Sequence, residues 1–237
     1  MRTKVPGALL LAALGLLAAC GQNATEPAAR GEAYFSAYGC VKCHAMGDNG
    51  GTYGPNLSFI GFRKSSQWLD MWLKNPHAWR PQTVMPNFHL NDETRGALVA
   101  YLSAQQGQAW DKTGRPWNQP EVMGDSAKRG EILFNKAGCV ACHSQNGRGG
   151  YPNNNVAGNQ IPSLSKVYET YTKTELVAKI RAGVTPTPAD PNAPAPMLYM
   201  PKWGDRLKDE EISAVADFLI SLKPTGSAAK AAAKDDF

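Results

Sequence analysis

The sequence is poor in cysteine and histidine, and this limits the kinds of site that it can build. Its 237 residues include five cysteines and four histidines, and four of the cysteines fall in two short motifs. No pair is therefore left for a structural disulfide. Basic runs with interleaved aromatic residues are also missing, so the sequence gives little support for nucleic-acid binding. The apolar run at residues 5–19 is too short and ends too abruptly for a transmembrane helix.

The two cysteine motifs are Cys40-Val-Lys-Cys43-His44 and Cys139-Val-Ala-Cys142-His143, both of the form C-x-x-C-H. This is the attachment sequence of c-type haem. Cysteines at i and i+3 lie on one side of a helical turn, so both thiols can reach one porphyrin, and the adjacent histidine becomes the proximal iron ligand. A zinc site would need both pairs to fold together or a following H-x-x-x-H. Because each pair has its own histidine and the pairs are 99 residues apart, we predict two covalently bound haem c groups.

The motifs belong to a longer internal repeat. Residues 30–44 and 129–143 are identical at nine of fifteen positions, with a constant offset of 99. The identities outside the attachment sequence include an arginine, a phenylalanine and the glycine before the first cysteine. They indicate that the helix leading into each motif is duplicated too. Duplication of one haem domain is therefore the simplest interpretation.

The repeat divides the chain into a series of segments. We expect a first haem domain at 29–104, a connection at 105–125, a second domain at 126–223 and a disordered tail at 224–237. Trp110 and Trp117 in the connection suggest that it packs against a surface. Periodicity and capping signals predict helices over 31–37, 66–74, 173–183 and 209–222, and a helix that starts at Asn91-Asp92-Glu93.

The N-terminus has the layout of an export signal. Arg2 and Lys4 precede the apolar run, which ends at Leu17-Ala-Ala-Cys20, a sequence that looks like the lipobox of bacterial lipoproteins. We expect a lipoprotein signal peptide at 1–19, lipidation of Cys20 and a flexible tether at 20–28. The alternatives are ordinary cleavage that leaves a free thiol, or an uncleaved anchor. Removal of the signal lowers the formal net charge from +5 to +3.

Two methionines stand at equivalent places as candidate sixth ligands of iron. Met85 and Met200 are each followed by proline and precede a C-terminal amphipathic helix of their half. Proline fixes the backbone there, and a soft, neutral sulfur favours reduced iron. In the second half the rival is Met197, which lacks the proline. In the first half, His77 and His89 are the histidines outside the motifs, and His89 would give bis-histidine ligation, but we interpret both as surface or loop residues.

Each half resembles a class I c-type cytochrome. The resemblance rests on the approach helix, the C-x-x-C-H motif, the loops Gly54-Pro55-Asn56-Leu57 and Ile161-Pro162-Ser163-Leu164, the Met-Pro pairs and a terminal helix with an inward aromatic residue. It implies an all-α fold of two tandem cytochrome c domains, each a small helical bundle around covalent haem. It also implies that the first and last helices of each half cross at a glycine with two aromatic partners: Gly31, Phe35 and Tyr101 in the first half, and Gly130, Phe134 and Phe218 in the second.

The expected function is electron transfer. Two closed, six-coordinate haems with no spare base or substrate pocket visible in the sequence indicate a carrier with no catalytic residues. We expect a protein anchored by lipid to the inner or outer membrane, facing the periplasm. Its redox partners would be a quinol-oxidising complex and a terminal oxidase or reductase, met through small, short-lived interfaces. The alternatives are a tightly bound subunit of a larger membrane complex, or a two-haem peroxidase or thiosulfate-oxidising enzyme with an open or unusually ligated iron.

Overall fold

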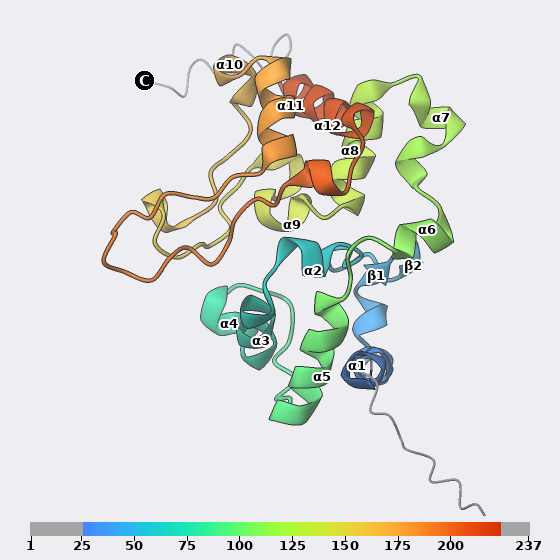
Figure 1. Cartoon of the computed structure of the whole chain (residues 1–237), viewed down its shortest axis with the longest axis vertical. Helices are drawn as coiled ribbons and strands as arrows, with labels where there is room; N and C mark the ends of the chain where they lie inside the picture. The colour runs from blue at the N-terminus through green and yellow to red at the C-terminus, as the bar shows by residue number, and fades with distance from the viewer. Residues whose placement is uncertain (1–25, 224–237) are drawn as a thin grey trace, which may run out of the picture.

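The computed structural model describes residues 26–223, and nearly all of the regular secondary structure in this part of the chain is helical (Figure 1). The elements of the first half are α1 (Glu26–Ala37), η1 (Cys40–Lys42), β1 (Ala45–Met46), β2 (Asn49–Gly50), α2 (Ile60–Arg63), α3 (Ser66–Lys74), α4 (Pro76–Trp79) and α5 (Asp92–Ser103). The strands β1 and β2 form one short antiparallel pair. The predicted all-α fold is confirmed.

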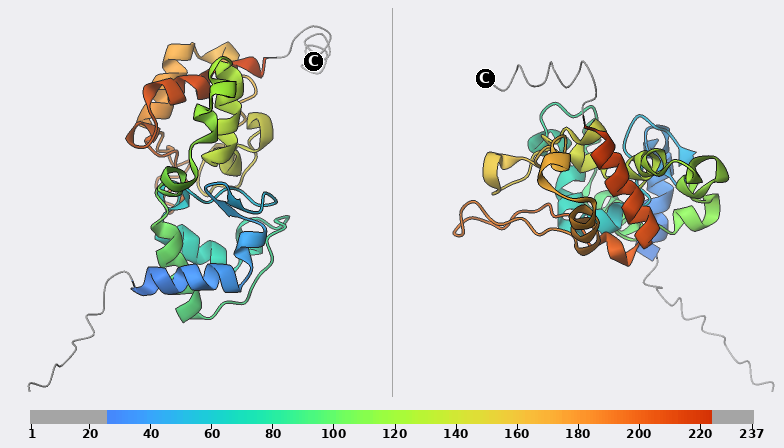
Figure 2. Two further views of the ribbon diagram at one scale, coloured as in Figure 1. Left: turned by 90° about the vertical axis from the view of Figure 1, so that its right-hand side faces the viewer. Right: turned by 90° about the horizontal axis from the view of Figure 1, so that it is seen from above.

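The second half repeats the helical plan with longer loops. Its elements are α8 (Ser126–Lys136), α9 (Val140–His143), η3 (Gln145–Gly147), η4 (Ala157–Asn159), α10 (Val167–Thr170), α11 (Lys173–Ala182), η5 (Trp203–Asp205) and α12 (Asp209–Ser221). Between the halves lie α6 (Ala109–Thr113), η2 (Pro116–Asn118) and α7 (Pro120–Met123). Figure 2 shows the two halves stacked end to end, with the long loop between α11 and η5 extending to one side.

The N-terminal predictions meet the structure only in part. The expected signal peptide at 1–19, the lipidated Cys20 and the tail at 224–237 lie outside the described residues. The expected tether at 20–28 is wrong at its end, because α1 already begins at Glu26. Glu26, an acidic residue in the first turn, and Pro27 beside it both favour a helix start at this point. Within residues 26–223, no helix is long and apolar enough to cross a bilayer.

Capping side chains fix the predicted helix starts. Ser65 accepts a hydrogen bond from the backbone of Trp68 at the start of α3, and Asn91 accepts one from Thr94 at the start of α5. Thr172 and Glu175 form the predicted capping box of α11. Each cap satisfies backbone N–H groups that the first helical turn leaves free. The predicted bounds of α3 are confirmed at both ends, and those of α11 and α12 agree with the structure to within a residue.

The terminal helices of each half cross at a glycine. A Cβ at Gly31 in α1 would collide with the backbone of Ala97 in α5, and a Cβ at Gly130 in α8 would collide with Ala214 in α12. Beside each crossing lies an aromatic pair: the rings of Phe35 and Tyr101 are 5.5 Å apart, and those of Phe134 and Phe218 are 5.4 Å apart. The missing side chain lets the backbones touch, so the predicted crossing is confirmed in both halves.

The connection between the halves is helical and docked on the second half. Trp110 and Trp117 are 1% and 0% exposed and pack edge to face, with ring centroids 5.0 Å apart. Trp117 donates a hydrogen bond of 2.6 Å to the buried carboxylate of Glu211 in α12. The two tryptophans therefore belong to the core of the second half, as their expected role in packing required.

The two halves share their cores across the boundary. Phe59, just before α2, packs edge to face on Trp203 of the second half, at 5.6 Å between ring centroids. In the opposite direction, Tyr151 and Leu198 of the second half are buried in the apolar cluster of the first. Figure 1 shows α2 and α9 facing each other where the halves meet. Loops of each half thus complete the apolar core of the other.

Candidate functional site: two haem attachment motifs

The first attachment motif is a tight helical turn. Gly39 has a φ of 71°, which reverses the chain after α1 at a conformation that favours glycine. From there η1 carries Cys40, and the backbone N–H of His44 donates to the carbonyl of Cys40 at 2.9 Å. The thiols of Cys40 and Cys43 are free, and Cys43 is exposed. This turn places two thiols and one imidazole close together, as attachment of a single porphyrin requires.

The ring of His44 is held by the loop that follows. Its Nδ1 lies 2.9 Å from the carbonyl oxygen of Pro55, so Nδ1–H donates a hydrogen bond there and Nε2 stays free to bind iron. Gly54 packs against the same ring so closely that an added Cβ would lie 2.5 Å from its Cε1. The Gly-Pro sequence therefore orients the imidazole, which is the usual role of a hydrogen bond to the second nitrogen of a metal-binding histidine.

Met85 lies on the same apolar cluster as Cys40. Trp72 of α3 donates from its Nε1 to Sδ of Met85 at 3.0 Å, which fixes the position of the thioether. His77 and His89, the alternative ligands, are both exposed. The structure therefore favours Met85 over either histidine as the partner of the first motif.

The second attachment motif repeats the turn as a short α-helix. Gly138, with a φ of 82°, replaces Gly39, and the backbone N–H of His143 donates to the carbonyl of Cys139 at 3.0 Å. Cys139 and Cys142 are free thiols. The imidazole environment differs from that of the first half, because Nδ1 of His143 is buried and has no hydrogen-bond partner in the described part of the chain.

Met200 is held by backbone pairing. Its N–H donates to the carbonyl of Val184 at 2.9 Å and its carbonyl accepts from the N–H of Val184 at 2.8 Å, so the loop before η5 is clamped to the end of α11. The side chain packs on the apolar cluster that also holds Cys139. Met197, the rival ligand, instead packs on the cluster of the first half. The structure thus separates the two methionines by the core that each one contacts.

Burial sets the protonation of both histidines. It lowers the pKa of His44, against a hydrogen bond to Pro55 that raises it. Burial, together with the nearby positive charge of Lys64, lowers the pKa of His143 to about 4. Both imidazoles are therefore neutral at neutral pH, the form that binds iron. Burial likewise raises the pKa of the Cys139 thiol to about 12, so this thiol is protonated when it is free.

Contacts across the domain boundary are the part of the site that sequence reasoning missed. Lys64, at the end of α2, places Nζ 3.3 Å from Sγ of Cys142, and Nη1 of Arg63 donates to the carbonyl of Gly138 at 3.0 Å. Nζ of Lys64 also lies over the ring of Tyr151, 5.4 Å from the ring centroid. A contact between residues 78 positions apart leaves no periodic trace in the sequence, so no signal pointed to it.

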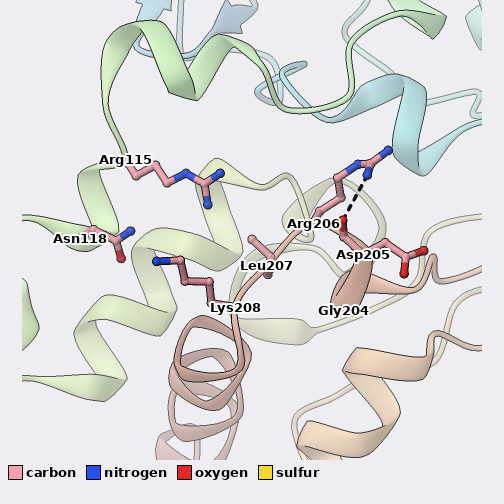
Figure 3. A pocket seen from close by; sticks show the side chains of 7 residues that line it. All are labelled: Arg115, Asn118, Gly204, Asp205, Arg206, Leu207 and Lys208. Atoms are coloured by element: carbon pink, nitrogen blue, oxygen red, sulfur yellow. Dashed lines mark hydrogen bonds between the residues drawn. The ribbon is translucent and has the colours of Figure 1, made fainter.

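A polar hollow outside the attachment motifs lies between the connection and the second half (Figure 3). It is open to solvent, has a volume of about 340 Å³, and is lined by Arg115 and Asn118 from the connection and by residues 204–208. Arg206 donates from Nη1 to the carbonyl of Asp205 at 3.1 Å on its rim. None of the motif cysteines, histidines or expected methionine ligands lines it, so it plays no part in the site described above.

The residues of both halves fit haem c. Each half combines two free thiols, a neutral histidine and a methionine on the apolar cluster of the motif, and buried Nδ1 of His143 is an unpaired polar atom within such a site. Cys40, Cys43, Cys139 and Cys142 would hold the porphyrins, and His44, Met85, His143 and Met200 would hold the irons. A donor set of imidazole and thioether would be suited to electron transfer.

This donor set on a duplicated helical fold defines a c-type haem protein. The chain belongs to the cytochrome c family, whose sequence pattern matches it twice, over residues 28–106 and 127–223. Members of this family transfer electrons through covalently bound haem.

Two further similarities cover unequal shares of the chains compared. Over 82 residues the chain is 29% identical to cytochrome c oxidase subunit 2 of Alkalihalophilus pseudofirmus. The aligned segment covers 31% of this chain and 24% of that protein. The chain therefore spans about a quarter of the length of that relative. A chain of the reducing HAO-like protein complex of Kuenenia stuttgartiensis is similar over 82% of this chain and 96% of its own length. The two chains are 16% identical, and the TM-score is 0.31.

Proposed function

We propose that this protein is an electron carrier with two covalently bound haems, anchored by lipid at Cys20, that relays single electrons between respiratory proteins. The observation that carries the proposal is the duplication of one closed site. Each half joins a C-x-x-C-H turn to a methionine that packs on the same apolar cluster as the first cysteine of its motif. Bound haem supplies a one-electron iron couple, and the protein sets its potential and excludes water.

The chain's own residues would hold the iron in a form that exchanges electrons but does not bind a substrate. Nε2 of His44 faces the iron site because Nδ1 donates to Pro55. The hydrogen bond from Nε1 of Trp72 holds the sulfur of Met85 in place. Histidine and methionine together would leave no coordination position for a substrate, which favours a carrier over a peroxidase or a thiosulfate-oxidising enzyme.

The anchor and the partners complete the proposal. The lipobox-like sequence that ends at Cys20 supports attachment to the inner or outer membrane, with both halves facing the periplasm. A quinol-oxidising complex on one side and a terminal oxidase or reductase on the other are the partners that suit a one-electron relay. Exchange with both requires weak interfaces that form and break quickly.

Purified full-length protein tests the closed state of both irons. We expect two covalently held haems per chain, the red-end absorption band of a methionine bound to ferric iron, and no reaction of the reduced protein with carbon monoxide. Rapid binding of carbon monoxide to either iron would favour the enzymatic alternative.

A second candidate role is a firmly bound subunit of a membrane respiratory complex. The observation that favours it is the similarity to a subunit of cytochrome c oxidase. Extraction of the native membrane in mild detergent separates the two roles. A free carrier migrates alone, whereas a subunit migrates with fixed companions and loses them only under harsher extraction.

A further inference from the structure

A continuous line of side-chain contacts joins the two candidate haem sites. It begins at Sδ of Met85, which accepts the hydrogen bond of 3.0 Å from Nε1 of Trp72. The indole of Trp72 is stacked on that of Trp68, with ring centroids 5.2 Å apart and planes 15° from parallel. The ammonium of Lys64 lies 4.4 Å from the centroid of Trp68, and the same nitrogen is 3.3 Å from Sγ of Cys142.

The middle of the line is buried, its ends are partly buried, and it crosses the domain boundary once. Trp68 is 4% exposed and Lys64 is 6% exposed. The expected axial sulfur of the first site stands at one end, and an attachment sulfur of the second site stands at the other. Three side chains lie between these two sulfurs, and each contacts the next.

We propose that Trp72, Trp68 and Lys64 form the electronic coupling route between the two haem sites. Electronic coupling through matter falls off more slowly across bonds, stacked rings and hydrogen bonds than across gaps, so a packed aromatic line couples better than a loose one. The stacked indoles offer polarisable π-systems in contact, and the cation over the ring ties them to the second attachment motif. This inference rests on the proposed function, because it needs a haem at each end.

The transfer involves no other chemistry. One electron leaves ferrous iron at one site and reduces ferric iron at the other, with no bond formed or broken and no proton moved. The tryptophans and the lysine are neither oxidised nor reduced along the way. They act as positioning residues that bring the two sites into electronic contact.

The direct test is flash photoreduction of the full chain carrying both haems, followed by the concentration-independent phase in which the electron redistributes between the sites. We expect Trp68→Leu, which removes the stack and the ring under Lys64, to slow this phase by about tenfold or more. Trp68→Phe keeps an aromatic ring and should restore part of the rate. Lys64→Met, which removes the contact with Cys142 at similar volume, should slow the phase as well.

Trp79→Leu is the matched control. Trp79 packs edge to face on Trp68, at 6.4 Å between centroids, but it lies off the line between the two sulfurs. The Trp79→Leu variant removes an indole from the same core and should leave the rate of electron redistribution within about twofold of that of the parent protein. Reduction potentials and the methionine absorption band, measured on every variant, show whether the driving force and the ligands are intact.

An unchanged redistribution rate in Trp68→Leu and Lys64→Met, with both potentials and the methionine band preserved, would overturn the inference. Equal slowing in Trp79→Leu would also overturn it, because any damage to this core would then suffice. If Trp68→Leu does not accumulate as folded protein, Trp68→Phe and Lys64→Met carry the test. A parent chain with fewer than two haems would instead refute the proposed function, a result visible before any rate is measured.

Discussion

His44 and Pro55 are joined by a hydrogen bond of 2.9 Å between Nδ1 and the backbone carbonyl, whereas His143 in the second half has no such partner among the described residues. A hydrogen bond from Nδ1 makes an iron-bound imidazole a stronger electron donor. Stronger donation stabilises ferric iron, so it lowers the reduction potential. We therefore expect the two halves to differ in reduction potential although their expected ligands are of the same types.

We predict two separable one-electron transitions in a spectroelectrochemical titration, with the first half at the lower potential. Pro55→Ala loosens the loop and weakens the hydrogen bond to His44, so it should raise the lower potential by up to about 59 mV, a tenfold change in the ratio of ferrous to ferric iron. The matched control is Pro162→Ala, at the equivalent position of the second half, which should leave the higher potential in place. A shift of both transitions in both variants would contradict the assignment.

The helix crossings predict that substitutions of different glycines will change the free energy of unfolding in opposite directions. Gly31→Val and Gly130→Val each force a side chain into the backbone of the crossing helix, at Ala97 and Ala214 respectively. We expect each to lower the free energy of unfolding by about 3 kcal/mol, as overpacking of a closed contact does.

The control for these variants is Gly96→Ala in α5. No atom lies within 4 Å of an added Cβ there, so alanine should stabilise the helix by about 0.5–1 kcal/mol. Urea unfolding followed by circular dichroism checks all three variants. Equal effects at the crossing and control positions would show that the helices do not meet as described.

Glu211 makes stability depend on pH at the acid end. Burial alone would raise the pKa of this carboxyl, but hydrogen bonds from the Lys208 backbone, Trp117 and Asn118, together with the charge of Arg115, lower it. A lowered pKa in the folded state means that the stabilisation is complete above the ordinary value of 4.5. It is lost as the pH falls through the lower, folded-state value.

Glu211→Gln should therefore unfold more easily than the parent at neutral pH, by about 1–3 kcal/mol, because a charged acceptor is lost. The difference between the two proteins should shrink as the pH falls below 4.5, where the parent carboxyl also becomes neutral. Chemical unfolding at a series of pH values checks this. A gap that stays constant down to strongly acid pH would contradict the proposed charge on Glu211.

Replacement of either expected methionine ligand should leave a free coordination position on the iron of that half. Met85→Ala and Met200→Ala should each create one iron that binds carbon monoxide and should halve the methionine absorption band, because alanine offers no ligand. Met197→Ala is the control, since Met197 lies in the same loop as Met200 but packs on the first half. It should leave both irons closed, and binding of carbon monoxide by this variant would favour Met197 as the ligand.

Local signals made much of the fold predictable. The caps at Asn91 and Thr172 and the glycine at position 31 each act through neighbouring residues or through one helix face, and such signals survive in a single sequence. The start of α1 was missed because Glu26 and Pro27 follow a segment that looked like a linker. Here a helix-start signal of two residues outweighed the composition around it.

Contacts between the halves could not be predicted from the sequence. The attachment motifs were recognisable because spacing alone determines their chemistry, but the placement of Lys64 on Cys142 depends on how two folded units dock. The same holds for Tyr151, which is buried in the core of the other half. Docking geometry depends on the complementarity of whole surfaces, and no local pattern in one chain records it.

We propose that each half binds one porphyrin covalently and that a methionine sulfur closes its iron. The most direct measurement is the number of covalently held haems per chain, by mass spectrometry of the denatured protein, combined with exposure of the reduced protein to carbon monoxide. We expect two haems per chain and no carbon monoxide complex. A single haem, or a carbon monoxide complex at either iron of the unmodified protein, would contradict it.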